Sequence, residues 1–257
     1  MDKFFQAKKY LAYLKRAKSK YYLHSPFVYQ FYLHVLEGEN NAELESIVLL
    51  RKKLRSNKTL LIAEDFGAGS SLAKSISSIE RKVSVRHQYG VLLNRLVKYF
   101  QPKNIFEIGS SIGLSSSYLA LGKPNANVIS LEGSLPIAEV AKQNHASLQI
   151  KNAEIVTGNF NETLSVALHR LSTVDLVFFD GNHTKEATLK YFHQCLEKHN
   201  EHSVFVFDDI YWSKEMSEAW EEIKLHTQVT LTIDVYQFGI CFFRKEKLAK
   251  ENFVLWY

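Results

Sequence analysis

Three carboxylates stand at the ends of two apolar runs of this 257-residue chain. Asp180 follows the run VDLVFF, and Asp208 and Asp209 follow the run SVFVF. If these runs are neighbouring strands, their carboxyl ends lie about 5 Å apart, at the edge where open α/β sheets bind ligands. Like charges that close need a proton or a cation, and such carboxylates suit Mg²⁺ or Mn²⁺. The sequence therefore predicts a divalent-metal site; the alternative for Asp180 and Asp208 is a role as helix caps on a polar rim.

A histidine accompanies the first of these acids. His183 follows Asp180 by three residues, in the loop expected after the same strand. The imidazole pKa of about 6.5 suits a general base at neutral pH, and imidazole also binds metals. We predict that His183 and Asp180 are catalytic residues; a metal ligand and an ordinary surface histidine are the alternatives for His183.

Two glycine clusters could cradle a nucleotide, DFGAGS at residues 65–70 and FEIGSSIG at residues 106–113. A nucleotide cradle needs a strand, a tight turn, a helix N-terminus and an acid about 20 residues later for the ribose hydroxyls. The first cluster has no acid ending a strand near residues 85–90. We interpret it as a lid made flexible by Gly67 and Gly69, or as a plain turn in a connecting loop.

The second cluster meets each requirement. Glu107 and Gly109 end an apolar run, Gly113 opens a helical segment, and Glu132 ends the next apolar run, VISLE. A carboxylate in that place can accept hydrogen bonds from both hydroxyls of a ribose. The sequence therefore predicts a nucleotide-containing cofactor at this loop, with Glu132 on its ribose.

The elements that must position these groups alternate between strand and helix from residue 89 onward. Strand-like runs are NIFEIG, NVISLEG, AEIVTG, VDLVFFDG and SVFVFDD, and a helical pattern follows each of them. Such alternation predicts a parallel sheet with helices on both faces. The last two runs, VTLTIDVY and GICFFRK, are joined by a short turn and predict an antiparallel hairpin. The predicted fold is α/β and Rossmann-like, with seven mostly parallel strands.

The N-terminal third of the chain lacks this alternation. Residues 1–60 are helical in pattern, and we interpret residues 65–88 as a loop with one helix. The expected division is a helical extension or lid over residues 1–88 and a cofactor-binding domain over residues 89–257.

The first 20 residues are strongly basic, with seven Lys or Arg and one Asp. Phe4, Ala7, Leu11, Leu14 and Ala17 recur at helical spacing, which predicts an amphipathic helix that packs through this stripe. We expect its basic face to be solvated; attraction of anionic substrates, membrane or RNA is the alternative.

Composition bounds the remaining possibilities. The chain is 46% hydrophobic and 23% charged, as in soluble globular proteins, and no apolar run approaches the ~20 residues that span a membrane. Its N-terminus lacks the apolar core of a signal peptide. Cys195 and Cys241 indicate neither a disulfide framework nor a zinc site. We expect a cytoplasmic location, a homodimer formed through the N-terminal segment, and no nucleic-acid partner.

The glycine spacing resembles that of a known family. E-x-G-x-x-x-G, from Glu107 to Gly113, is similar to motif one of class I S-adenosylmethionine-dependent methyltransferases and differs from the G-x-G-x-x-G of dinucleotide sites. The C-terminal hairpin is also similar to that fold, and the resemblance covers about residues 89–245. The segments NIFEIGSSIGLSSSYLA, VISLEGS, VTGNFNETL, VDLVFFDGNH and VFVFDD resemble the catechol and caffeoyl-CoA O-methyltransferase group in order and spacing. The whole chain resembles uncharacterised methyltransferases of Bacteroidetes, which indicates a reaction type but no substrate.

The resemblance implies S-adenosylmethionine as the cofactor and assigns residues to its parts. The loop residues would line its methionine end, Glu132 would hold the ribose, and the residues after the third strand would flank the adenine. The implied cofactor-binding residues are Glu107, Gly109, Ser110, Gly113, Ser115, Glu132, Gly133, Asn159, Phe160 and Asp180.

The resemblance also bears on the acids. In this group two Asp and one Asn bind a divalent metal, and this chain has Asp209 where Asn is usual. Related animal enzymes carry a catalytic Lys at the place of His183. In such enzymes a metal lowers the pKa of the substrate hydroxyl and fixes its oxygen.

Three hypotheses of function remain open at this point. The first is metal-assisted O-methylation of a small hydroxylated molecule such as a catechol, a polyketide or a sugar. The second is a metal-independent methyltransferase acting on N, O or RNA, with the basic helix as a docking arm. The third is a non-catalytic Rossmann-like binding protein or an NAD(P) oxidoreductase; the glycine spacing and the hairpin argue against the oxidoreductase. Specificity is expected from residues 1–88 and 210–217, which offer an aromatic pocket of Tyr22, Phe27, Tyr211 and Trp212.

Overall fold

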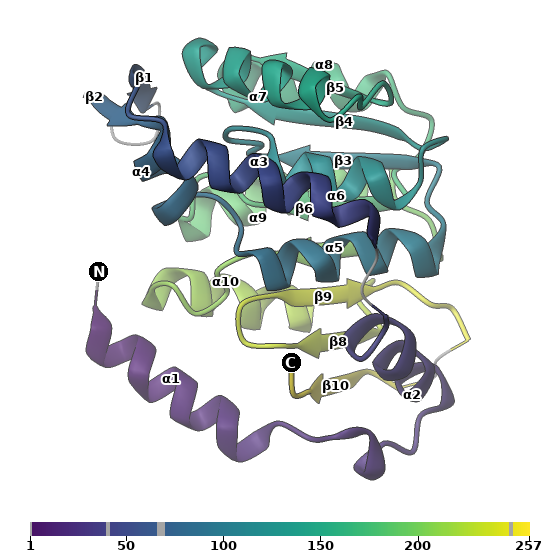
Figure 1. Cartoon of the computed structure of the whole chain (residues 1–257). Helices are drawn as coiled ribbons and strands as arrows, with labels where there is room; N and C mark the ends of the chain where they lie inside the picture. The colour runs from purple at the N-terminus through teal and green to yellow at the C-terminus, as the bar shows by residue number, and fades with distance from the viewer. Residues whose placement is uncertain (1, 40–41, 66–69, 247–248) are drawn as a thin grey trace. The chain divides into compact units, whose positions relative to one another are not determined.

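The computed structural model describes residues 2–39, 42–65, 70–246 and 249–257. They group into two compact units, Met1–Leu36 with Ser172–Tyr257, and Glu37–Leu171 (Figure 1). Both units combine mostly parallel strands with helices, which confirms the predicted α/β, Rossmann-like class. Over the described ranges, no helix is long and apolar enough to cross a lipid bilayer. The predicted boundary at residue 88 stays a prediction.

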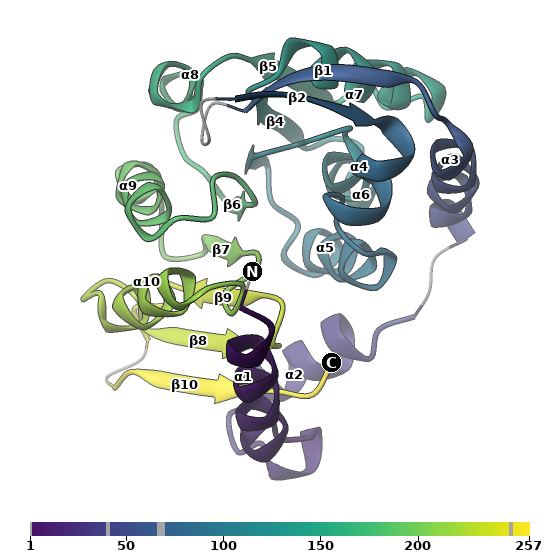
Figure 2. The same cartoon turned by 90° about the vertical axis from the view of Figure 1, so that its left-hand side faces the viewer.

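Three parallel strands form the centre of the unit Glu37–Leu171. β4 lies between β3 and β5, with Ile108 opposite Leu131 and Glu132 opposite Thr157. Helices α5, α6 and α7 lie on one face of these strands and α8 on the other (Figure 2), which is why every residue of β3 and β4 after the first is buried. The elements are α5 (His87–Phe100), β3 (Asn104–Ile108), α6 (Leu114–Gly122), β4 (Asn127–Glu132), α7 (Leu135–Ser147), β5 (Ala153–Thr157) and α8 (Phe160–His169).

A hairpin that the sequence did not predict precedes α5. Strand β1 (Leu60–Asp65) pairs antiparallel with β2 (Ser70–Ser75) along its whole length. The prediction of a loop with one helix over residues 65–88 is therefore wrong for β2 and confirmed for the helix, α4 (Ile76–Lys82). The serine-rich sequence of β2 lacks the β-branched and aromatic residues that signal a strand. Gly67 and Gly69 lie outside the described residues.

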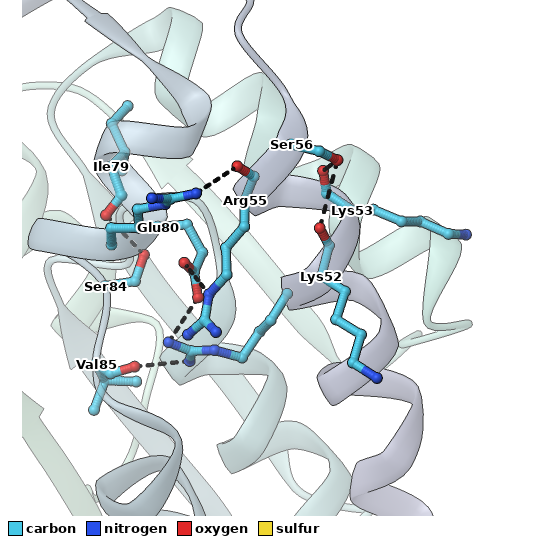
Figure 3. Close-up of polar contacts among 10 residues, drawn as sticks. Lys52, Lys53, Arg55, Ser56, Ile79, Glu80, Ser84 and Val85 are labelled. Atoms are coloured by element: carbon cyan, nitrogen blue, oxygen red, sulfur yellow. Dashed lines mark hydrogen bonds and ion pairs between the residues drawn. The ribbon is translucent and has the colours of Figure 1, made fainter.

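A buried ion-pair cluster joins α4 to α3 (Glu45–Ser56). The carboxylate of Glu80, which is 1% exposed, lies 2.9 Å from Arg51 Nη2 and 2.8 Å from Arg55 Nε (Figure 3). Arg51 is also buried and donates a hydrogen bond to the carbonyl of Val85 at 2.8 Å. Charges are tolerated inside a protein when each has an opposite partner, so the cluster depends on all its members.

The other unit contains the predicted hairpin and one strand more than predicted. β6 and β7 are parallel, and β9 runs antiparallel to both β7 and β8. β10 then adds to the far side of β8 in parallel orientation, so the described strands β3 to β10 number eight where seven were predicted. The bounds are β6 (Leu176–Phe179), β7 (Val204–Phe207), β8 (Leu231–Asp234), β9 (Gly239–Phe242) and β10 (Glu251–Val254).

Aromatic side chains fill both faces of these strands. On one face, Phe207 contacts Phe192 of α9 (Lys185–Leu196) and Trp220 of α10 (Lys214–Leu225), with ring centroids 5.9 and 6.1 Å apart. On β9, Phe242 contacts Phe31, which ends α2 (Pro26–Phe31), at 5.9 Å. Large aromatic rings bury much apolar area and so hold the helices to the strands.

Three short turns complete the described helical elements. A 3-10 turn, η1 (Lys20–Tyr22), precedes α2, and a π-helical turn, η2 (Tyr32–Leu36), follows it. The 3-10 turn η3 (Ala42–Leu44) precedes α3 in the other unit.

Helix α1 (Lys3–Arg16) crosses the carboxyl ends of β8 and β10 (Figure 2) and packs through a face that the sequence did not indicate. Tyr13 is 2% exposed, and its hydroxyl donates to the carbonyl of Leu255 at 2.7 Å. The amide of Gln6 donates to the carbonyl of Trp212 at 2.9 Å. The prediction that the apolar stripe of α1 packs inward is wrong, because Phe4 is 82% and Leu11 58% exposed.

The aromatic residues predicted to line a substrate pocket have separate contacts. The guanidinium carbon of Arg244 lies 3.9 Å from the centroid of the Phe27 ring. The buried hydroxyl of Tyr211 instead donates to the carboxylate of Asp234. Tyr22 is 68% exposed. These contacts give Phe27 and Tyr211 packing roles within their unit.

Candidate functional site

The loop between β3 and α6 forms a backbone cradle at the carboxyl edge of the strands. The N–H groups of Gly109 and Ser110 both donate to the carbonyl of Leu131, at 3.0 and 2.9 Å, and so hold the loop beside β4. Gly109 (φ 96°) and Gly113 (φ 78°) adopt the left-handed conformation that favours glycine. Gly113 caps α6, whose first N–H groups have no partner within the helix and attract anionic or polar ligands.

Helix α7 also holds this loop in place. The side-chain amide of Asn144 donates to the carbonyl of Ile112 at 2.8 Å. His145 Nε2 lies 2.7 Å from the hydroxyl of Ser116 and 3.3 Å from the carbonyl of Gly113. Burial lowers the pKa of His145 to about 4, so the ring is neutral at physiological pH. The cradle is therefore fixed before any ligand arrives.

Glu132 ends β4 with its carboxylate held by the main chain. One oxygen accepts from the N–H of Ser111 at 2.8 Å and the other from the N–H of Ser134 at 2.9 Å. Burial raises the pKa of this carboxyl, and the N–H groups of Ser134, Ser111 and Gly133 oppose that shift. Each carboxylate oxygen has about two acceptor positions, so both oxygens can also accept from a ligand. This geometry suits the two hydroxyls of a ribose.

Buried polar atoms without partners gather at the same edge. Among the described residues, seven of the twelve buried side-chain atoms that lack a hydrogen-bond partner lie here. A buried polar atom without a partner destabilises the protein unless a ligand or water satisfies it. The set therefore fits a ligand rich in polar groups, as S-adenosylmethionine is. These atoms belong to Glu107, Ser110, Ser111, Ser130, Ser134 and Thr157.

Glu107 is the most deeply buried member of this set. Its side chain is fully buried, and burial raises the pKa of its carboxyl to about 7. The hydroxyls of Ser115 and Ser130 approach the carboxylate and lower its pKa, without the alignment of a full hydrogen bond, and the charge of Glu132 raises it further. A cationic group of a ligand would stabilise the charged form of Glu107.

The raised pKa of Glu107 predicts a specific pH dependence of stability. A carboxyl with a folded-state pKa near 7 and an unfolded value of 4.5 binds more protons in the folded state between those values. Its contribution is therefore full at pH 4.5 and below, and is lost as the pH rises through 7, by up to about 3 kcal/mol. We expect Glu107→Gln to remove this loss. In urea unfolding of the ligand-free proteins, the free energy of unfolding of the variant should therefore rise relative to that of the wild type between pH 5 and pH 8.

The exposed Glu139 on α7 supplies the control for this comparison. Glu139→Gln should follow the wild-type pH dependence within ~0.5 kcal/mol. If Glu107→Gln and wild type lose stability in parallel from pH 5 to pH 8, the Glu107 carboxyl is not buried in the protonated form that we describe.

The loop after β5 places the two residues predicted beside the adenine. The N–H of Gly158 donates to the carbonyl of Glu132 at 2.9 Å, which keeps this loop next to β4. Asn159 caps α8, and its side chain accepts from the N–H of Asn161 at 3.0 Å. Phe160 is the first residue of α8 and is half-buried. Contact with an adenine stays a prediction for both residues.

The acids predicted to form a metal site converge in the other unit. Asp180 follows β6, Asp208 follows β7, and the N–H of Asp208 donates to the carbonyl of Phe179 at 2.9 Å, which extends the pairing of the two strands. The carboxyl group of Asp180 lies beside that of Asp208 and lowers its pKa. His183 Nε2 lies 3.5 Å from Asp180 Oδ1. The structure thus brings together Asp180, His183, Asp208 and Asp209, which we call the acidic cluster.

Burial and crowding shape the protonation of this cluster. Burial and the nearby charge of Asp209 raise the pKa of Asp208 to about 8. The amide of Gln237 donates to Asp208 Oδ1 at 2.7 Å and to Asp209 Oδ1 at 2.5 Å, and so opposes the rise. Burial lowers the pKa of His183, and the charge of Asp209 opposes that shift. The cluster therefore holds a proton where a cation would otherwise balance its charge.

The chemistry of the cluster fits a hard divalent cation, although its present geometry differs from a ligand set. Carboxylate oxygens are the ligands that Mg²⁺ prefers. Within the described part of the chain, no group of three or more His, Cys, Asp and Glu side chains has the arrangement of a metal site. The Gln237 amide stands between Asp208 and Asp209 and takes up one oxygen of each. A bound metal would have to displace that amide or use the second oxygen of each acid.

Several residues of both sites were missed by sequence reasoning. Gln237 lies in the turn between β8 and β9, and nothing in VYQFG marks it as a partner of the acids. Asn144 and His145 act on the cradle from a helix 30 residues away in sequence, where only the fold reveals them. Ser130 and Thr157 could have been suspected, since a hydroxyl within or at the end of a buried strand is itself unusual.

Comparisons with known proteins agree with these features. A family model described as a methyltransferase domain matches residues 106–210, the segment that runs from β3 through the acids after β7. The catechol O-methyltransferase of Mycobacterium tuberculosis (strain ATCC 25618 / H37Rv) is 29% identical over 152 residues, which cover 58% of this chain and 67% of that protein.

Solved structures share the fold at low identity. The O-methyltransferase of Bacillus cereus, in complex with S-adenosylhomocysteine, matches with a TM-score of 0.57 and 20% identity over 82% of this chain and 94% of that chain. The O-methyltransferase TomG of Streptomyces achromogenes, in complex with S-adenosylmethionine, matches with a TM-score of 0.59 and 19% identity over 84% of this chain and 95% of that chain. At such identities the likeness establishes the fold.

Proposed function

We propose that the chain is a class I S-adenosylmethionine-dependent O-methyltransferase of the catechol and caffeoyl-CoA type and that it methylates a hydroxyl of a small molecule with the help of a divalent metal. The observation that carries the proposal is the acidic cluster, in which Asp180, Asp208 and Asp209 crowd at the ends of two adjacent strands with His183 beside them. A cofactor-binding protein without this chemistry would have no use for such a cluster.

The residues of the cradle would bind the cofactor, which supplies an activated methyl group. Glu132 would accept hydrogen bonds from the ribose hydroxyls through the free positions on its two oxygens. Glu107 would balance the positive charge of the methionine end, and the N–H groups at the start of α6 would face its carboxylate. The unpartnered hydroxyls of Ser110, Ser111 and Thr157 would complete the polar contacts.

The acidic cluster would bind the metal and the acceptor. Asp180, Asp208 and Asp209 would hold Mg²⁺ or Mn²⁺, which lowers the pKa of a bound hydroxyl. His183 would take the proton from that hydroxyl as general base. A catechol, a polyketide or a sugar hydroxyl meets these requirements, whereas RNA recognition would need a nucleic-acid module that the fold does not contain among its described elements.

One observation favours a second candidate, a metal-independent methyltransferase. The side-chain amide of Gln237 donates to both Asp208 and Asp209, so one oxygen of each acid already has a hydrogen-bond partner within the protein. In that case His183 and the acids would orient the acceptor hydroxyl by hydrogen bonds alone.

Chelation distinguishes the two candidates. With a panel of catechol, polyketide and sugar acceptors and labelled cofactor, we expect exhaustive chelation to lower transfer by at least about tenfold and Mg²⁺ or Mn²⁺ to restore it. Calorimetric titration with Mn²⁺ gives a readout that does not depend on activity, and Asp208→Asn should weaken Mn²⁺ binding. Asp175→Asn, which changes an acid just before β6, at the end of that strand opposite the acidic cluster, is the matched control. Full activity after chelation would favour the metal-independent reaction.

A further inference from the structure

The positive charge of this protein is concentrated at its N-terminus. Residues 1–20 contain seven Lys or Arg and one Asp, whereas the whole chain has a net charge of +5, so the rest carries −1. Between Asp2 and Glu37 the sequence has no acidic residue. Asp2 itself is engaged as the cap of α1, where its carboxylate accepts from the N–H groups of Phe4 and Phe5 at 3.1 and 3.0 Å.

One face of α1 contacts the rest of its unit, and the opposite face does not. Gln6 and Tyr13 face the carboxyl ends of β8 and β10, and Lys9 and Arg16 on that side lie against the ring and hydroxyl of Tyr211. The opposite face is formed by residues 4, 8, 11 and 15, which recur at the i, i+4, i+7, i+11 spacing of one helix face. We call Phe4, Lys8, Leu11 and Lys15 the outer face of α1.

This outer face mixes apolar and basic side chains without partners of its own. Phe4 and Leu11 are 82% and 58% exposed, and Lys8 and Lys15 are exposed between them. Within the described chain neither lysine forms an ion pair with a carboxylate. The next turn, η1, adds Tyr21 and Tyr22, which are 83% and 68% exposed.

We propose that the outer face of α1 binds an anionic lipid surface. Lysines beside an anionic membrane each increase partitioning about fivefold, and exposed phenylalanine, leucine and tyrosine side chains insert at the boundary between head groups and acyl chains. Lysine stems can lie along the apolar boundary while the ammonium groups reach the head groups. The charge and the apolar side chains lie on one helix face, so a flat surface engages both together.

The charge pattern favours lipid over the other anionic partner. A nucleic-acid duplex would engage the lysines but would leave Phe4 and Leu11 in water, since its backbone offers them no apolar surface. A lipid surface buries both kinds of side chain. This inference is independent of the proposed reaction and concerns only where the chain binds.

Vesicle sedimentation with the full-length protein tests the proposal. The protein should sediment with vesicles that contain about one third phosphatidylglycerol, stay in solution with pure phosphatidylcholine, and be released as salt rises. Lys8→Gln with Lys15→Gln should lower the partition coefficient about 30-fold. Phe4→Ser with Leu11→Ser should lower it at least about tenfold.

A matched pair of lysines controls for net charge. Lys52 and Lys53 are exposed on α3, and their side chains point away from the Glu80 cluster (Figure 3). Lys52→Gln with Lys53→Gln removes the same charge and should change partitioning less than about twofold. The proposal is overturned by equal losses in the two double variants or by no sedimentation with anionic vesicles. It is also overturned if binding to a single-stranded RNA is tighter than to vesicles, or if Phe4→Ser with Leu11→Ser converts a dimer to a monomer in light scattering.

Discussion

Replacing His183 with alanine should lower the rate of methyl transfer by about 10²–10⁴-fold, the contribution of a positioned general base. The imidazole is half-buried at the end of β6, and Asp180 lies 3.5 Å from its Nε2 atom and can orient the ring. Alanine keeps the loop but removes the proton acceptor. The rate should be measured in a single turnover at saturating cofactor and acceptor, so that binding does not contribute.

Two further measurements separate the roles open to His183. Affinity for S-adenosylhomocysteine should be unchanged in His183→Ala, since the cradle is built from other residues. His202→Ala removes a histidine whose side chain is 87% exposed, and should leave the rate within about twofold of wild type. A loss of Mn²⁺ affinity in His183→Ala would make His183 a ligand, and an unchanged rate would place the base elsewhere.

Replacing Glu80 with alanine should lower the free energy of unfolding by about 3–5 kcal/mol. Glu80 is 1% exposed and is the carboxylate partner of the buried Arg51 and of Arg55 (Figure 3). Without it, the Arg51 guanidinium stays inside the protein with its charge uncompensated. Urea unfolding followed by circular dichroism would measure the loss.

The matched control is an ion pair of the same unit at the surface. Glu43 contacts Lys98 at 3.0 Å, and their side chains are 63% and 33% exposed. Glu43→Ala should change the free energy of unfolding by no more than about 1 kcal/mol, because water solvates the charge that remains. Similar losses in the two variants would contradict the view that the Glu80 cluster holds α3 to α4.

The strands were predictable from the sequence because their burial leaves few choices of residue. β6 and β7 read LVFF and VFVF, apolar at every position, and every one of these residues is buried. The cradle was predictable for a related reason: a left-handed turn at Gly109 and Gly113 and a carboxylate at the end of the next strand are local requirements.

Long-range partners explain what the sequence did not reveal. Tyr13 of α1 finds its hydrogen-bond acceptor 242 residues later, so the packing face of α1 cannot be inferred from the helix alone. The sequence alone places Phe4 and Leu11 in the interior, because apolar side chains are usually buried. β10 is recognisable as a strand only beside β8, since it has only four residues, ENFV, and the segment RKEKLAK before it is mostly charged.

Titration with S-adenosylhomocysteine tests the central claim, that the cradle of Glu107, Gly109, Gly113 and Glu132 is the cofactor site. The wild-type chain should bind this ligand in a calorimeter and should prefer it to NAD. Glu132→Ala, checked by circular dichroism to be folded, should lose about 1.5–3 kcal/mol of binding free energy, which is roughly 10- to 150-fold in affinity. Glu139→Ala on α7 should bind as the wild type does. Equal affinity in Glu132→Ala, or a preference of the wild type for NAD, would contradict the assignment.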